Sequence, residues 1–295
     1  MWDEGYVEAG GTRFHVRSLG EGPNLALLLH GWPEDGSAWR RVAPLLAEGG
    51  FRVACPDLKG LGQSDAPRKG YDPRTLGDEL SRLIRGLGAK KALVVGHDWG
   101  GAVALAGSFR HPGHVLGLVL ISFPYRDIDL RAAWHVPLFN IPWLPEAAFR
   151  FASRPLIRAA MRHITSVREA IDDEAVEIYA ASVRRNPRAW LAYYRTLSRA
   201  AVKEQASSAL RRVTPFGKKH ERHQLRVPAL VIWGEEDPAT PVKLGEGTAR
   251  DLDAELVRLA GVGHCPPEED PLAVARAILA FARPLVSVRS IATSA

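Results

Sequence analysis

LVVGHDWGGA, from Leu93 to Ala102, is the most informative stretch of this chain. The apolar run that ends at Val95 predicts a buried strand, the glycines predict a tight turn, and the apolar residues after Ala102 predict a helix. This is the pattern of the G-x-S-x-G motif, which presents a nucleophile at a sharp bend, with Asp98 in place of the serine. A serine there forms acyl-enzymes, whereas a carboxylate attacks saturated carbon and becomes an alkyl ester. The alternative is that Asp98 only caps the helix, because carboxylates are common at helix N-termini.

Strands and helices are expected to alternate on both sides of this motif. The expected strands cover residues 14–20, 25–31, 51–57, 92–95, 116–122, 229–233 and 254–259. The expected helices cover 39–49, 76–87, the stretch after Ala102, 242–252 and 271–281. This alternation predicts an α/β fold, with a mostly parallel central sheet flanked by helices.

The pattern changes between residues 126 and 216. This segment has no convincing strand and several apolar helical stretches rich in Arg, Ala and Trp. We interpret it as an inserted helical cap. The core is then discontinuous, with residues 1–125 and 217–284, and residues 285–295 form a small, frayed C-terminal tail.

The composition is that of an ordinary globular protein, with 295 residues, 46% of them hydrophobic and 24% charged. No apolar run approaches the ~20 residues of a membrane span, and residues 1–22 show no signal-peptide pattern. Cys55 and Cys265 lack a metal-like spacing and fit a reducing compartment. We therefore expect a cytoplasmic protein with no membrane partner and no metal site.

The formal charge of +6 raises the question of nucleic-acid binding. The arginines are concentrated between residues 126 and 226, on what we interpret as exposed helical faces. They are not accompanied by an aromatic-interleaved RNA motif or a zinc spacing. We expect a solvated surface and no nucleic-acid partner.

Two further residues, both much later in the chain than Asp98, complete a catalytic set. Asp237 and His264 each follow a predicted strand, so they are expected at the same edge of the sheet as Asp98. Asp98 is already ionised at pH 7, so His264 is needed only afterwards, as a neutral base that takes a proton from the water that hydrolyses the ester. Asp237 would hold the imidazole in the correct tautomer. Glu235 and Glu236 are close enough in sequence to compete for that role.

HGWPE, from His30 to Glu34, follows a buried strand and is the expected oxyanion hole. Its donors would be the backbone N–H groups of Trp32 and Trp99, which would bind the Asp98 carboxylate and later the oxyanion formed from its ester. The alternative is a simple turn. The sequence leaves open whether the Trp32–Pro33 bond is cis.

Several motifs together resemble those of one known family. HGWPE with Trp39-Arg40, CPDLKGLGQSDAP (Cys55 to Pro67) and GHDWGG look like the epoxide hydrolase branch of the α/β-hydrolase superfamily. Haloalkane and haloacetate dehalogenases are near relatives of this branch. The order nucleophile, acid, His is also that of α/β-hydrolases. The resemblance covers nearly all of the chain outside the cap and implies an α/β-hydrolase fold.

The same resemblance implies two cap residues that donate hydrogen bonds to the epoxide oxygen. The stretch AYYRTL matches the family's aromatic-Tyr-Arg segment and makes Tyr194 one donor; AWHVP matches the other, with His135 where tyrosine is typical. This is a departure, although a small subgroup of epoxide hydrolases similarly pairs His with Tyr. A donor is needed because the opening epoxide forms a strongly basic alkoxide, which a neutral phenol can protonate at pH 7. Tyr179 and Tyr125 are less favoured alternatives.

The sequence therefore predicts a cofactor-free epoxide hydrolase that converts an apolar epoxide and water into a vicinal diol, as a monomer or homodimer. The expected lining of its aromatic pocket is Trp32, Trp99, Trp134, Phe139 and Trp143. A dehalogenase is the first alternative, with indole N–H groups of Trp99 and Trp134 as halide donors. Trp32 argues against it, because many haloalkane dehalogenases carry asparagine there. The second alternative is a catalytically silent fold used for ligand sensing or protein interaction.

Overall fold

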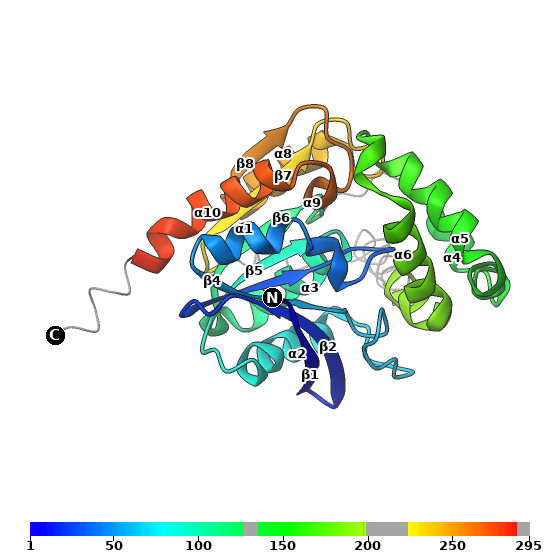
Figure 1. Ribbon diagram of the computed structural model, residues 1–295, viewed down its shortest axis with the longest axis horizontal. Helices are drawn as coiled ribbons and strands as arrows, with labels where there is room; N and C mark the ends of the chain where they lie inside the picture. The colour runs from blue at the N-terminus through cyan, green and yellow to red at the C-terminus, as the bar shows by residue number, and fades with distance from the viewer. Residues whose placement is uncertain (127–134, 197, 199–223, 288–295) are drawn as a thin grey trace, which may run out of the picture.

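The computed structural model describes residues 1–126, 135–196, 198 and 224–287. Its centre is an eight-stranded sheet with the order β1-β2-β4-β3-β5-β6-β7-β8 (Figure 1). The strands are β1 (Asp3–Ala9), β2 (Thr12–Leu19), β3 (Asn24–Leu29), β4 (Phe51–Pro56), β5 (Ala92–His97), β6 (Val115–Ile121), β7 (Ala229–Gly234) and β8 (Glu255–Leu259). The hairpin β1–β2 and the pair β2–β4 are antiparallel, and every other pairing in the sheet is parallel. The predicted mostly parallel sheet is confirmed.

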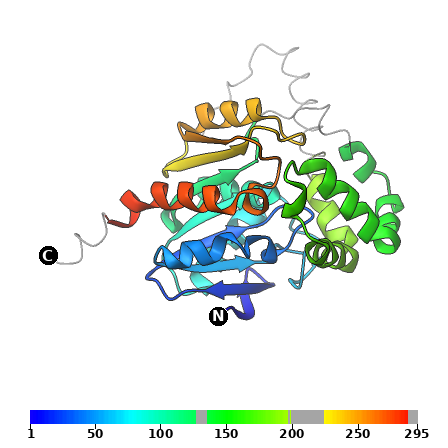
Figure 2. The same ribbon diagram turned by 45° about the horizontal axis from the view of Figure 1, so that its top comes forward.

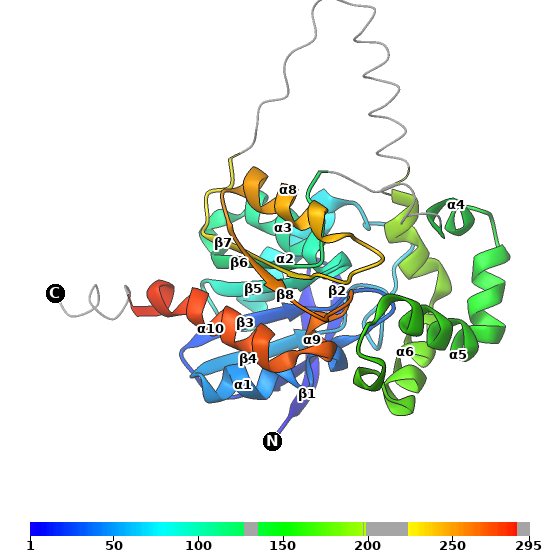
Figure 3. The same cartoon turned by 90° about the horizontal axis from the view of Figure 1, so that it is seen from above.

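Helices cover both faces of this sheet. Helices α1 (Val42–Glu48) and α10 (Pro271–Ser287) lie on one face, while α2 (Pro73–Gly86), α3 (Trp99–Arg110) and α8 (Val242–Leu252) lie on the other (Figure 3). Successive residues of the central strands alternate between these layers. Val94 belongs to the cluster under α2 and α3, and Val95 to the cluster under α1 and α10. The central strands β3, β5 and β6 are almost entirely apolar because both of their faces are buried.

The cap helices lie together at one end of the sheet (Figures 1 and 2). They are α4 (His135–Phe139), α5 (Leu144–Ile164), α6 (Asp173–Arg185) and a further helical stretch over residues 187–196. Helix α5 contains Pro155 and is kinked at Ala152, whose φ of −129° is not helical. The limits of the cap at 126 and 216 stay a prediction, because residues 127–134 and 199–223 lie outside the described residues, as does most of the predicted tail.

Short helical turns complete the chain that is described. They are η1 (Gly36–Trp39), η2 (Pro112–His114), η3 (Arg168–Ala170) and α9 (Pro266–Glu269). Within the described residues, no helix combines the length and apolar character that a membrane crossing requires.

The structure differs from the expected elements in two places. Strand β1 was not predicted, because its residues are almost all exposed and lack an apolar run. The expected helix over 39–49 is divided: η1 is capped by the Asp35 side chain, which accepts the Ser37 N–H, and α1 begins only at Val42. The hydrogen bond from Ser37 to Asp35 thus favours a separate short turn over one continuous helix from residue 39 to residue 49.

Candidate active site

Asp98 stands at the bend between β5 and α3 with a φ of +47° and a ψ of −118°, and a positive φ is uncommon for a residue other than glycine. Two glycines make this bend possible. A Cβ on Gly96 would lie 2.4 Å from the Gly100 carbonyl oxygen, and a Cβ on Gly100 would lie 2.1 Å from the Leu29 carbonyl oxygen. The bend leaves 21% of the Asp98 side chain exposed.

The two carboxylate oxygens of Asp98 have different partners. Oδ1 accepts the Trp32 backbone N–H at 3.0 Å, and Oδ2 lies 3.6 Å from Nε2 of His264. Burial opposes ionisation, but the His264 and His97 rings and the Trp32 N–H outweigh it and lower the pKa of Asp98. The Asp98 carboxylate is therefore ionised at neutral pH. The Trp32–Pro33 peptide bond is cis.

His264 is held by a buried carboxylate on its other side. Its Nδ1 donates to Asp237 Oδ2 at 2.8 Å, which leaves Nε2 facing Asp98. Asp237 also accepts N–H groups from Ala239 at 2.8 Å and Thr240 at 2.7 Å, so its orientation is fixed. Burial lowers the pKa of His264, but Asp237 and Asp98 outweigh this and raise it well above the ordinary value. Glu235 is exposed and pairs with Arg258, away from the ring.

The sequence analysis missed a buried pair behind this set. His97 donates from Nδ1 to Glu34 Oε2 at 3.0 Å and from Nε2 to the His264 carbonyl oxygen at 2.8 Å. Glu34 Oε2 also accepts the Gly31 N–H at 2.9 Å. Burial opposes the charge of His97, but Glu34 raises its pKa. The pair ties together the elbow, the HGWPE loop and the His264 loop. The sequence signal that could have revealed this pair is the presence of His97 in the GHDWGG motif and of Glu34 in the HGWPE motif.

Tyr194 belongs to a buried aromatic cluster beside Asp98. Its ring centroid lies 4.8 Å from that of Trp99 and 4.9 Å from that of Phe139. Burial and the negative charge of Asp98 raise the pKa of Tyr194 well above its ordinary value, against a hydrogen bond with the Trp99 side chain. The phenol is therefore protonated, as a donor must be.

The cluster also contains aromatic residues that the sequence analysis did not single out. The Trp190 ring lies 5.2 Å from Trp32 and 4.7 Å from Phe149, centroid to centroid. These contacts join cap helices to the HGWPE loop. Helix periodicity alone gives no sign of which cap aromatics face the core, so Trp190 and Phe149 had no distinguishing signal.

The other predicted pocket residues are placed differently. The prediction that Trp143 lines the pocket is wrong, because its side chain is 82% exposed just before α5. Its left-handed backbone, with a φ of +52°, starts the helix from the surface. Trp134 lies outside the described residues, and for His135 only the backbone, at the start of α4, is described. The Tyr179 hydroxyl donates to Glu268 instead of facing Asp98.

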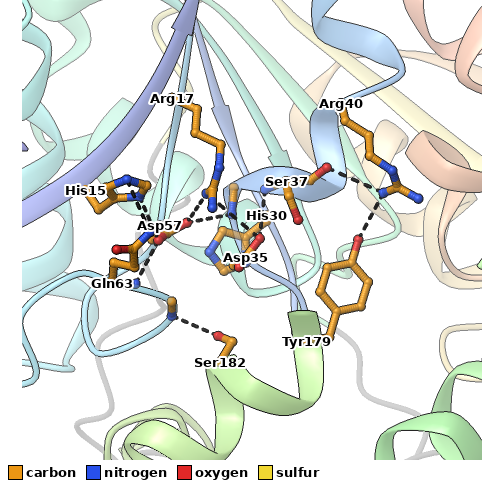
Figure 4. Close-up of polar contacts among 12 residues, drawn as sticks. His15, Arg17, His30, Asp35, Ser37, Arg40, Asp57, Gln63, Tyr179 and Ser182 are labelled. Atoms are coloured by element: carbon orange, nitrogen blue, oxygen red, sulfur yellow. Dashed lines mark hydrogen bonds and ion pairs between the residues drawn. The ribbon is translucent and has the colours of Figure 1, made fainter. Parts of the chain in front are cut away.

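A buried loop between the core and the cap is organised by Asp57, in the CPDLKG segment. Its carboxylate accepts hydrogen bonds at 2.8 Å from Arg17 and from the N–H groups of Gly36 and Gln63 (Figure 4). Burial opposes ionisation, but these donors and His15 lower the pKa of Asp57 to about 2. The same loop reaches α6, where the Gly62 N–H donates to Ser182 Oγ at 2.8 Å. The loop that follows Asp57 thus forms a hydrogen bond with helix α6 of the predicted cap.

Comparison with known proteins fits this geometry. The family model described as alpha/beta hydrolase fold matches residues 25–271, and the chain belongs to that family. Epoxide hydrolase 4 of Homo sapiens is 27% identical over 292 residues, which cover 93% of this chain and 77% of that protein. Epoxide hydrolase 3 of Xenopus tropicalis is 32% identical over 256 residues, with coverages of 79% and 64%.

A solved structure gives the same result. The crystal structure of epoxide hydrolase A from Mycobacterium thermoresistibile superposes with a TM-score of 0.78 at 25% identity, covering 96% of this chain and 98% of the other. The resemblance to the epoxide hydrolase branch is confirmed. Among the described residues, no group of three or more His, Cys, Asp or Glu side chains could hold a metal ion.

Proposed function

We propose that this protein is a cofactor-independent epoxide hydrolase that opens an apolar epoxide through a covalent ester on Asp98. The observation that carries the proposal is the pair of partners on the Asp98 carboxylate. Oδ1 accepts the Trp32 N–H at 3.0 Å, and Oδ2 faces a histidine that is itself bonded to Asp237. A carboxylate that served only as a helix cap would not require a buried imidazole–carboxylate pair beside it.

In the first step Asp98 attacks one carbon of the epoxide. The new carboxylate–carbon bond forms as the carbon–oxygen bond of the ring breaks, and the leaving alkoxide takes the phenolic proton of Tyr194. His135 is proposed as the second group that binds this oxygen. The protonated, buried state of the Tyr194 phenol supports its role as the acid.

In the second step His264 removes a proton from water, and the hydroxide attacks the carbonyl carbon of the Asp98 ester. Trp32 N–H already binds the carboxylate oxygen, so it is in position to stabilise the oxyanion, with Trp99 N–H proposed as the second donor. Collapse of the oxyanion expels the second diol oxygen, which takes the proton of the newly added hydroxyl, so the diol is released and the Asp98 carboxylate is restored. The proton on His264 then returns to the Tyr194 phenolate. The proton taken up by His264 balances the one that Tyr194 gave to the alkoxide, and the net reaction adds one water.

The loss of charge on Asp98 prepares His264 for this second step. Asp98 is one of the groups that raise the pKa of His264 in the free protein. Formation of the ester removes that negative charge, so the pKa of His264 falls and the neutral imidazole becomes more populated. Formation of the ester therefore favours the neutral His264 that the hydrolysis of this ester requires.

Dehalogenation is the second candidate, because a halide leaves without a proton and is stabilised by N–H donors. The buried indole N–H groups of Trp32 and Trp190 have no hydrogen-bond partner in the part of the chain that the structure describes. The two reactions share the attack by Asp98 but differ in the leaving group.

One assay separates the two candidates. The protein is given a terminal epoxide and the haloalkane with the same carbon skeleton, and diol and free halide are measured. Diol formation without halide release is expected. Halide release without diol formation would make the protein a dehalogenase, and turnover of neither across a panel of terminal, internal and styrene-type epoxides would favour the silent fold.

A further inference from the structure

Glu269, the last residue of α9, accepts hydrogen bonds from the residues on both sides of the proposed catalytic histidine, His264. Its Oε2 accepts the Gly263 N–H at 2.9 Å and its Oε1 accepts the Cys265 N–H at 3.0 Å. These N–H groups belong to the residues immediately before and after His264. The loop that carries the proposed base is therefore closed around one buried carboxylate, which is 9% exposed.

The same carboxylate also binds the cap. Oε2 accepts the backbone N–H groups of Ser166, at 2.7 Å, and Val167, at 3.0 Å, where the chain leaves α5. A further bond crosses the same boundary, because the His264 N–H donates to the Ile164 carbonyl oxygen at 2.8 Å. Glu269 thus receives four backbone N–H groups, two from the histidine loop and two from the cap segment that follows α5.

The cap segment and the histidine loop are in close contact at Gly263. A Cβ at this position would lie 2.7 Å from the Ile164 carbonyl oxygen and 2.8 Å from the Ser166 nitrogen. Only glycine fits there without a displacement of one backbone from the other. The contact is therefore tight as well as hydrogen-bonded.

We propose that Glu269 is a positioning residue, which fixes the orientation of His264 and makes it depend on the seating of the cap segment at residues 164–167. The proposal rests on the proposed function, because it assigns His264 the hydrolysis of the ester. A carboxylate suits the site because both of its oxygens accept hydrogen bonds and all four partners are donors. A glutamine would offer one oxygen, and its amide NH₂ would face an N–H donor.

This role has a consequence for only one half of the reaction. Asp98 attacks the substrate without help from a base, so its rate depends little on how well His264 is oriented. Hydrolysis needs Nε2 of His264 aimed at a water beside the ester, and small misplacements of a catalytic group reduce rates strongly. A loosened histidine loop should therefore slow hydrolysis much more than ester formation.

The test is to measure both half-reactions in the wild-type protein and in Glu269→Gln by single-turnover kinetics with mass detection of the alkylated protein. Hydrolysis is expected to fall by about 10²-fold, with little change in ester formation, so that alkylated protein accumulates. Gly263→Ala keeps Glu269 but pushes the loop away from the cap segment, and it should give the same pattern. It carries the test if Glu269→Gln does not fold.

Asp270→Asn is the matched control. It makes the same charge change at the next position, where the carboxylate accepts the Ala273 N–H at the start of α10 and has no bond to the histidine loop. Asparagine caps helices as well as aspartate, so both half-reactions should stay near wild type. Equal slowing of both steps in Glu269→Gln, or unchanged hydrolysis in Gly263→Ala, would overturn the proposal. If the wild type forms no alkyl ester, the proposed function itself fails.

Discussion

The ring of His264 lies 3.6 Å from the carboxylate of Asp98, measured from Nε2 to Oδ2. This separation exceeds an ordinary hydrogen bond, whereas the bond from the same ring to Asp237 is 2.8 Å. His264 is thus firmly bound to Asp237 and only loosely associated with Asp98. That arrangement suits a base that must later turn its proton-accepting nitrogen to water beside the Asp98 ester.

Replacement of the nucleophile should abolish turnover. Asp98→Ala is expected to lower diol formation by roughly 10³-fold or more, because the substitution removes the carboxylate that is proposed to form the ester. Asp253→Ala is the control, because it also replaces an aspartate of positive φ, +52°, with alanine. Asp253 lies at a helix end away from the site, so the activity of this variant should stay near that of the wild type. Comparable activity in both variants would remove Asp98 from the mechanism.

Replacement of the base should separate the two steps. His264→Gln leaves Asp98 ionised, so the ester still forms, but no neutral imidazole remains to activate water. The expected result is a protein whose mass increases by that of one substrate molecule and decays slowly. Intact-protein mass spectrometry measures this directly. Rapid diol release from the variant would show that another group activates water.

Tyr194 should act mainly in ester formation. Tyr194→Phe removes the phenolic proton, and the rate of ester formation should fall by about 10²-fold, the usual size of general-acid assistance. Tyr193→Phe is the neighbouring control, because the Tyr193 hydroxyl donates to the Lys59 carbonyl oxygen at 3.0 Å and serves the contact between cap and core. If the two variants form the ester equally fast, Tyr194 is not the acid.

The pH dependence of the two steps should differ. The lowered pKa of Asp98 keeps the nucleophile ionised as the pH falls, so ester formation continues in mild acid. In the ester, His264 keeps Asp237, which raises its pKa, but no longer faces the charge of Asp98. As the pH falls it gains a proton and then cannot act as a base. Alkylated protein at steady state should therefore increase as the pH is lowered through the pKa that His264 has in the ester. Parallel loss of both rates, with no accumulation, would contradict this assignment.

The fold and the central set could be predicted from the sequence because their signals are local. Asp98 stands in a short motif between an apolar strand and a helix, and Asp237 and His264 each follow a strand. Parallel strands bring the residues after their carboxyl ends to one edge, so chain order was sufficient to group the three. The buried strands were equally clear, because both faces of the sheet are covered.

The supporting contacts could not be predicted because their partners are backbone groups far away in the chain. Glu269 binds N–H groups of the cap that lie about a hundred residues earlier, and no side-chain pattern records such a bond. Trp143 shows the opposite error: the sequence predicts that this aromatic residue of the cap lines the pocket, yet it is 82% exposed. Strand β1 was missed because an exposed edge strand needs no apolar alternation.

The central claim is that a covalent ester forms on Asp98, and oxygen labelling tests it most directly. One turnover in heavy-oxygen water, with the protein in excess over substrate, is followed by peptide mass spectrometry of the segment that contains Asp98. Attack of water on the ester carbonyl carbon places the heavy oxygen in the Asp98 carboxylate, and this is the predicted result. Heavy oxygen found only in the diol, with Asp98 unlabelled, would mean direct attack of water on the epoxide and would contradict the account.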